Sequence, residues 1–116
     1  MRILVVDDEK EVVDLLKEYL EGKGHSADGA FDGMEAVKLI KADNYDIAFI
    51  DENMPELSGL EVVKFVKQNA LRIKTVILTG YPAIDENLAR GVGADGFLRK
   101  PIELDQIAEV IERFQK

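Results

Sequence analysis

Five polar residues that could do chemistry each follow a short apolar or strand-like run. They are Asp7, Asp8, Asp51, Thr79 and Lys100. If the runs are neighbouring parallel strands, the three aspartates meet at one edge of a sheet. At about 5 Å, with an effective dielectric constant near 20, each like-charged pair costs roughly 3 kcal/mol, so the acids call for a cation. Hard oxygen ligands of this kind suit Mg²⁺, which phosphate oxygens and water then complete.

The runs before these residues are predicted to be strands. Residues 3–6, 47–50 and 75–78 are short, continuous and apolar, as is typical of strands buried on both faces of a parallel sheet. Residues 25–30 and 95–98 are weaker and more polar, which favours the two edges.

Helical periodicity separates the strands. Apolar residues recur at helical spacing in five segments: Val12 to Leu20, ending at Gly22-Lys23-Gly24; Met34, Val37 and Ile40, ending near Asn44; Leu60 to about Asn69; Ile84, Leu88 and Val92, with Pro82 in the first turn; and Leu104 to Phe114. The alternation predicts an α/β fold, a single-domain (βα)5 doubly wound parallel sheet of the flavodoxin-like type, with strand order 2-1-3-4-5.

Composition limits the functional classes. The 116 residues make one domain, and a formal net charge of −8 argues against direct binding to nucleic acid or to a membrane surface. The chain has no cysteine, no apolar run long enough for a membrane span and no signal-peptide layout, so we expect a cytoplasmic protein. The one histidine, His25, is expected to lie at the surface or at a strand edge.

Several of these residues also have a plain structural interpretation. Asp8 with Glu11 resembles a capping box before a helix, Lys100 could be a solvated loop lysine, and Thr79 a strand-end hydroxyl. Their recurrence at matching strand ends favours one site. By contrast, residues 91–96 match G-x-G-x-x-G but follow a helix and lead into a strand, so we interpret them as a helix stop and turn.

The whole chain resembles the receiver (REC) domain of two-component response regulators, of the chemotaxis-regulator type. The motifs that carry the resemblance are Val5-Val6-Asp7-Asp8-Glu9, Phe49 to Pro55 with Gly59, Leu78-Thr79-Gly80 and Arg99-Lys100-Pro101. The resemblance implies that Asp51 is the phosphoacceptor and that Mg²⁺ is held by Asp7, Asp8, Asp51 and the backbone carbonyl of Asn53. It also implies that Thr79 and Lys100 bind the phosphoryl group, that Phe97 is the switch aromatic, and that the Lys100-Pro101 peptide is cis.

The same resemblance implies a signalling domain rather than an enzyme acting on a separate substrate. Residues 1–116 would form the receiver, with no output domain in this chain. A sensor histidine kinase or a histidine phosphotransfer protein would supply the phosphoryl group, and a downstream protein would bind residues of about 82–114. Phe97 has no hydroxyl where the family often carries Tyr, and we expect Asn53 and Tyr81 to tune hydrolysis of the phosphorylated form.

Three other classes fit less well. A phosphohydrolase with an Asp nucleophile would carry D-x-D after its first strand, whereas here Asp51 and Asn53 follow the third. A flavodoxin-like electron carrier needs a phosphate loop after its first strand, where Asp7-Asp8-Glu9 would repel phosphate. A binding module that is never phosphorylated would have lost part of the acid, threonine and lysine set, and all of it is present.

Overall fold

Five parallel strands form one sheet in the order β2-β1-β3-β4-β5, as the sequence predicts. The computed structural model describes residues 1–115 of the chain. The strands are β1 (Arg2–Val6), β2 (Ser26–Ala30), β3 (Ile47–Asp51), β4 (Lys74–Thr79) and β5 (Gly96–Arg99). The two polar strands, β2 and β5, lie at the edges, and every residue of β3 is buried.

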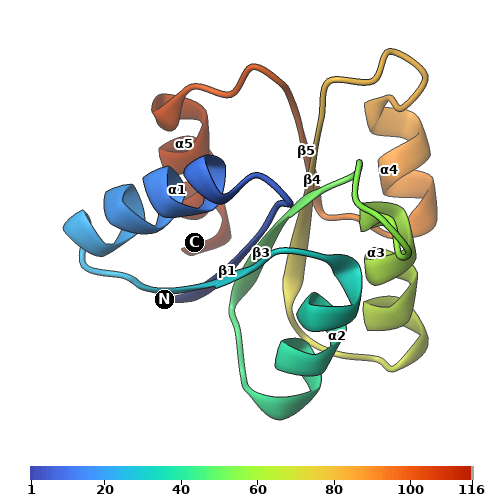
Figure 1. Ribbon diagram of the computed structural model, residues 1–116, viewed down its shortest axis with the longest axis horizontal. Coiled ribbons are helices and arrows are strands. Elements are labelled where there is room, and N and C mark those ends of the chain that lie inside the picture. The colour runs from blue at the N-terminus through green and yellow to red at the C-terminus, as the bar shows by residue number, and fades with distance from the viewer. Residues whose placement is uncertain (116) are drawn as a thin grey trace.

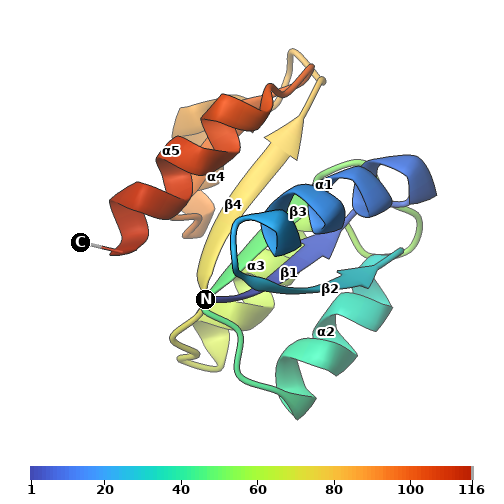
Figure 2. The ribbon, with the colours of Figure 1, turned by 90° about the vertical axis from the view of Figure 1, so that its left-hand side faces the viewer.

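Five helices cover the sheet in two layers (Figures 1 and 2). The helices α1 (Lys10–Gly22) and α5 (Leu104–Gln115) lie on one face. The other face carries α2 (Gly33–Ala42), α3 (Gly59–Gln68) and α4 (Glu86–Val92). Within the described residues, no helix combines the length and the apolar character needed to cross a membrane.

Alternate residues along the strands pack into two separate hydrophobic cores. Ile3 and Phe49 pack in the cluster under α1 and α5, whereas Leu4 and Ile50 pack in the cluster under α2, α3 and α4. This is the two-residue period of a strand that is buried on both faces. The period fixes which side of the sheet any residue near a strand end faces.

The helix after β4 begins later than predicted. Pro82 lies in the connecting loop, and α4 starts at Glu86, where the Asp85 side chain accepts a hydrogen bond from the Leu88 amide. A side-chain cap of this kind outweighs the preference of proline for a first helical turn. Consequently α4 has only seven residues, its one fully buried residue is Ala89, and Leu88 is 43% exposed.

The apolar face of α2 is also displaced from the prediction. Met34 is 57% exposed, and the helix instead buries Gly33, Ala36 and Ile40. Gly33 belongs to the core because a β-carbon there would lie 2.3 Å from the Leu57 carbonyl oxygen. The close approach of the loop at Leu57 turns the helix so that its small residues face inward.

The glycine-rich segment after α4 is a helix stop and turn, as predicted. Gly93 caps α4 with a φ of +121°, and its amide donates to the carbonyls of Ala89 and Arg90. A side chain is disfavoured at this φ, which explains a glycine there without any nucleotide-binding role.

Candidate functional site

Asp51 is the last residue of β3 and is only 4% exposed. The backbone around it is fixed from two sides: the Glu52 amide donates to the Leu78 carbonyl at 3.0 Å, and the Gly59 amide donates to the Glu52 carbonyl at 3.2 Å. A β-carbon at Gly59 would lie 2.6 Å from the Asp51 carbonyl oxygen, so only glycine allows the start of α3 to pack this closely. The Asp51 carboxylate therefore stands on a rigid strand end.

Asp7 and Asp8 bring two further carboxylates to the same edge, from the loop after β1. Asp7 is fully buried, and its amide donates to the Ala30 carbonyl at 3.1 Å, which extends the pairing of β1 with β2 by one residue. Asp8 is exposed. One oxygen from each of Asp7, Asp8 and Asp51 lies within 4.8 Å of the others, so the structure brings the three acids together.

Asp8 does not cap the following helix. The N-cap residue of α1 is Glu9, and no side chain supplies a cap hydrogen bond there. The capping-box interpretation of Asp8 with Glu11 is therefore wrong, and the Asp8 carboxylate stays available to the cluster.

Lys100 lies between the two buried acids. Its Nζ atom donates to Asp7 Oδ2 at 2.9 Å and lies 3.1 Å from Asp51 Oδ1. The Lys100 amide donates to the Thr79 carbonyl at 2.9 Å, and the Lys100-Pro101 peptide bond is cis. The interpretation of Lys100 as a solvated loop residue is wrong, because its side chain is only 24% exposed and pairs with both acids. We refer to Asp7, Asp8, Asp51 and Lys100 as the acidic site.

Burial dominates the electrostatics of this site. The pKa of Asp51 is raised to about 6, first by burial and then by the Asp7 charge, and Lys100 only partly opposes the shift. For Lys100 itself, burial works toward a lower pKa, but hydrogen bonds and charge interactions with Asp7 and Asp51 outweigh burial and the pKa is raised. One ammonium group therefore reduces the repulsion among the acids without removing it.

A shallow pocket of about 260 Å³ opens over the acidic site. Its lining residues come from the last positions of β3 and β4 and from the loops after β1, β3, β4 and β5: Asp8, Glu9, Asp51, Asn53, Thr79, Gly80, Tyr81 and Lys100. Thr79 is buried, and its Oγ1 accepts a hydrogen bond from the Tyr81 amide at 3.0 Å. Asn53 and Tyr81 are exposed and border the opening.

Sequence reasoning gave no role to Glu9, which also lines this pocket. Its amide donates to Asp7 Oδ1 at 2.9 Å, so the turn that carries Glu9 holds Asp7 in place. The signal was its position directly after Asp7-Asp8 in the same loop. Phe97, the predicted switch residue, lies outside the pocket; it is partly buried and packs against the core under α2, α3 and α4.

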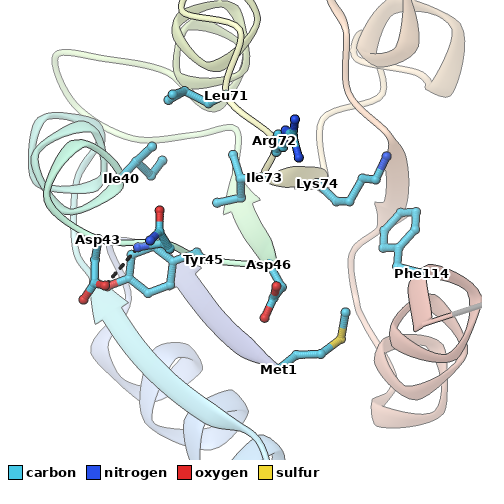
Figure 3. Close-up of a pocket in the computed structure, with 11 residues that line it drawn as sticks. Met1, Ile40, Asp43, Tyr45, Asp46, Leu71, Arg72, Ile73, Lys74 and Phe114 are labelled. Carbon is cyan, nitrogen blue, oxygen red and sulfur yellow. Dashed lines mark hydrogen bonds between the residues drawn. The ribbon is translucent and has the colours of Figure 1, made fainter.

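A different pocket, of about 390 Å³, lies at the opposite edge of the sheet (Figure 3). Asp43 and Asp46 line it, but both are already engaged: Asp43 pairs with the Arg2 guanidinium, and Asp46 Oδ2 accepts the Arg2 amide at 2.7 Å. The buried charges of the molecule converge only at the acidic site among the residues described. We therefore take the acidic site as the candidate functional site.

The family model of the response regulator receiver domain matches residues 3–112. The chain belongs to this family. Among curated relatives, the transcriptional regulatory protein DltR of Streptococcus agalactiae is 36% identical over 108 residues, which are 92% of this chain and 48% of DltR. This receiver thus spans about half the length of the curated relatives it matches.

Solved structures agree with this assignment. The receiver domain of the Francisella response regulator 1452 has a TM-score of 0.90 and 31% identity, covering 97% of this chain and 94% of that one. The response regulator TrrA of Thermotoga maritima, solved in complex with Mg²⁺ and BeF, has a TM-score of 0.88 and 36% identity, covering 97% of each chain. The receiver fold and the membership of a signalling family therefore rest on both sequence and structure.

Proposed function

We propose that this receiver accepts a phosphoryl group on Asp51 from the phosphohistidine of a sensor histidine kinase or a histidine phosphotransfer protein. The observation that supports this is the Asp51 carboxylate at a rigid strand end, 3.1 Å from Lys100 Nζ and open to a pocket. An Asp51 oxygen forms a bond to phosphorus while the phosphorus–nitrogen bond breaks, and the electron pair of that bond stays on the imidazole. The loose transition state of phosphoryl transfer requires position and charge neutralisation more than a strong nucleophile.

The donor set fits a Mg²⁺ ion. Carboxylate oxygens of Asp7, Asp8 and Asp51 lie within 4.8 Å of one another, and hard oxygen ligands with excess negative charge are what this ion prefers. We propose that these three side chains, with the backbone carbonyl of Asn53, hold it. When bound, it supplies positive charge next to the phosphoryl oxygens.

Lys100 and Thr79 contribute the remaining contacts in this proposal. Lys100 Nζ already lies beside Asp51, so it donates to a phosphoryl oxygen after a small movement. Thr79 Oγ1 accepts from the Tyr81 amide, which leaves the hydroxyl proton for a phosphoryl oxygen. Lys100 neutralises charge that the transfer places on Asp51, and Thr79 donates a hydrogen bond to it.

Loss of the phosphoryl group would occur at the same pocket. Asn53 and Tyr81 border the opening and are exposed, so their size and polarity control how water approaches the acyl phosphate. We therefore propose that they set the rate of self-dephosphorylation. The receiver would act on its own aspartyl phosphate and on no separate substrate.

The signal would leave through the face formed by α4, β5 and α5, within residues of about 82–114. The short α4 with one fully buried residue is the least anchored helix described, and Phe97 packs beside it in the same core. We propose that Thr79 moves toward the phosphoryl group, that Phe97 fills the space left, and that a downstream protein binds the altered face. Binding would be to protein rather than directly to nucleic acid, in the cytoplasm, with residues 1–116 acting as the receiver unit.

Intact mass after incubation with acetyl phosphate and Mg²⁺ tests the proposal. We expect a gain of one phosphoryl group on the wild-type chain and none on Asp51→Ala. Excess chelator should suppress the gain. Undiminished modification of Asp51→Ala, or of the wild type in chelator, would contradict the assignment of Asp51 or of the metal.

A further inference from the structure

One side chain holds the loop between β4 and α4, residues 80–85. Arg99 is the last residue of β5 and is exposed. Its Nη1 donates to the Tyr81 carbonyl, and its Nη2 donates to the Ile84 carbonyl at 2.7 Å. A guanidinium is planar with its donors in a fixed fork, so it can bridge two carbonyls that a lysine could not bridge with the same geometry.

The same arginine covers Phe97. The two residues are two positions apart on β5 and so share one face of the strand. The Arg99 guanidinium lies 5.0 Å from the centroid of the Phe97 ring, within range of a cation–π interaction. The ring therefore has the core on one side and Arg99 beside it.

Tyr81 joins this arrangement to the acidic site. Its carbonyl accepts from Arg99, and its amide donates to Thr79 Oγ1 at 3.0 Å. Thr79 and Arg99 are also partners in the register of β4 with β5. A displacement of the Thr79 hydroxyl thus breaks its hydrogen bond with the Tyr81 amide, and Tyr81 is the residue whose carbonyl Arg99 holds.

We infer that Arg99 is a positioning residue that opposes the response of this receiver to phosphorylation. It holds the loop, the Phe97 ring and, through Tyr81, the Thr79 hydroxyl as they stand with Asp51 unmodified. For Thr79 to turn toward a phosphoryl oxygen and Phe97 to move behind it, Arg99 must release or shift both contacts. Any contact made only in the unmodified arrangement lowers the population of the altered one. This inference rests on the proposed function of Asp51.

Three variants separate the effect of the two hydrogen bonds from Arg99 to the loop from the effect of its positive charge. Arg99→Gln removes both, and Arg99→Lys keeps the charge but cannot span both carbonyls. Arg72→Gln removes the same charge from an exposed position in the loop before β4, at the opposite edge of the sheet, and is the matched control. Because Arg99 is exposed, all three variants should fold, and melting temperatures check this.

The first measurement is amide hydrogen exchange of the unmodified proteins. The Ile84 amide donates to the Tyr81 carbonyl at 3.2 Å, the carbonyl that Arg99 also holds. We expect exchange at Ile84 to be on the order of three- to tenfold faster in Arg99→Gln and Arg99→Lys, with no change in Arg72→Gln. The Phe97 ring resonances should shift in the Arg99 variants alone.

The second measurement is titration with beryllofluoride and Mg²⁺, followed by amide chemical shifts near Thr79. We expect Arg99→Gln and Arg99→Lys to reach half-saturation at a concentration about three- to tenfold lower than wild type. Equal or weaker binding, or an Arg99→Lys variant that matches wild type in both measurements, would overturn the inference. If the wild type itself takes up no beryllofluoride, the proposed function fails instead; hydrogen exchange and the Phe97 shifts then still decide whether Arg99 holds the loop.

Discussion

The amino ends and the carboxyl ends of the strands form two opposite edges of the sheet, which carry similar charged groups. The pKa values of the carboxylates shift in opposite directions at these two edges. At the amino edge, Arg2 is surrounded by Asp28, Asp43, Tyr45 and Asp46, which we call the amino-edge cluster. At the carboxyl edge, Lys100 is surrounded by Asp7, Asp8 and Asp51. Each region thus has three aspartates and one basic residue.

Burial makes the difference. The side chains of Asp28 and Asp43 are 46% and 43% exposed. Arg2 divides its donors among the acids: its guanidinium pairs with Asp43 and Asp28, and its amide donates to Asp46. The hydrogen bond from Arg2 lowers the pKa of Asp43. At the acidic site the side chains of Asp7 and Asp51 are 1% and 6% exposed and share one ammonium, and the pKa of Asp51 is raised to about 6. The carboxylates of the amino-edge cluster are therefore stabilised by water and by Arg2, whereas the buried carboxylates of the acidic site are only partly neutralised by Lys100.

Removal of the basic side chain should show the largest difference in stability between the two edges. Lys100→Gln leaves two buried carboxylates without a neighbouring cation, so we expect a loss of about 2–4 kcal/mol in the free energy of unfolding. Arg2→Gln should cost much less because its partners are hydrated. Urea denaturation at pH 7.5 in chelator measures both. Adding Asp51→Asn to Lys100→Gln should restore part of the loss, and an equal cost at the two edges would contradict the burial argument.

The pH dependence of stability should differ in sign between the edges. The folded protein holds the Asp51 proton up to a pH of about 6, above the ordinary pKa, so folding is favoured at low pH and this advantage is lost as pH rises from 4 to 6 and beyond. A shift of this size corresponds to about 3 kcal/mol. The stability difference between Asp51→Asn and wild type should therefore grow in favour of the variant from pH 4 to pH 7.5.

Asp43 supplies the opposite case for the same experiment. Its pKa is lowered, so its contribution to stability is present above the ordinary carboxyl pKa and is lost as pH falls through the lowered value. Asp43→Asn should thus lose stability relative to wild type near neutral pH and converge with it in acid. A difference that does not change with pH for either variant would show that the two environments are alike.

Tyr45 tests how firmly the amino-edge cluster is held. Its hydroxyl donates to Asp28 Oδ2 at 2.8 Å, and burial together with this hydrogen bond raises its pKa to about 12. Tyr45→Phe should cost about 1 kcal/mol in thermal or urea unfolding, because Asp28 keeps access to water and to Arg2. Tyr19→Phe on α1 is the comparison variant. A larger loss of stability in Tyr19→Phe than in Tyr45→Phe would contradict the stabilising role of the Tyr45 hydroxyl.

Asp8 should give the smallest effect on the apo fold and a clear effect on metal binding. It is exposed, so Asp8→Asn should relieve repulsion by less than about 1 kcal/mol in chelator. Addition of Mg²⁺ should raise the melting temperature of wild type and raise that of Asp8→Asn less. A lower melting temperature of the variant in chelator would mean that Asp8 stabilises its loop by a local contact.

Sequence alone predicted the strand ends well because each apolar run stops abruptly at a polar residue. The order of strands followed from their polarity, which marks β2 and β5 as edges. The start of α4 was missed because a local cap at Asp85 competes with Pro82, and the exposure of Met34 was missed because the approach of Leu57 to Gly33 is a long-range contact.

Side-chain pairing lay beyond sequence reasoning. Lys100 pairs with Asp7 across 93 positions of the chain, and Arg99 holds carbonyls 18 and 15 positions away. Neither contact has a periodic or local signature. The residues at the site could therefore be named in advance, but the state in which Lys100 bridges the two acids could not.

The alternation along the strands also separates the two halves of the chemistry. Asp51 continues the series Ile47 and Phe49, which faces α1 and α5, whereas Thr79 and Arg99 continue the series of Ile77 and Phe97, which faces α3 and α4. The two series thus run on opposite faces of the sheet, and Asp51 and Thr79 share one pocket only at the carboxyl ends of the strands. Of the proposed partner face, α4 packs on the layer away from the acids, so its sequence can diverge while the acids stay unchanged.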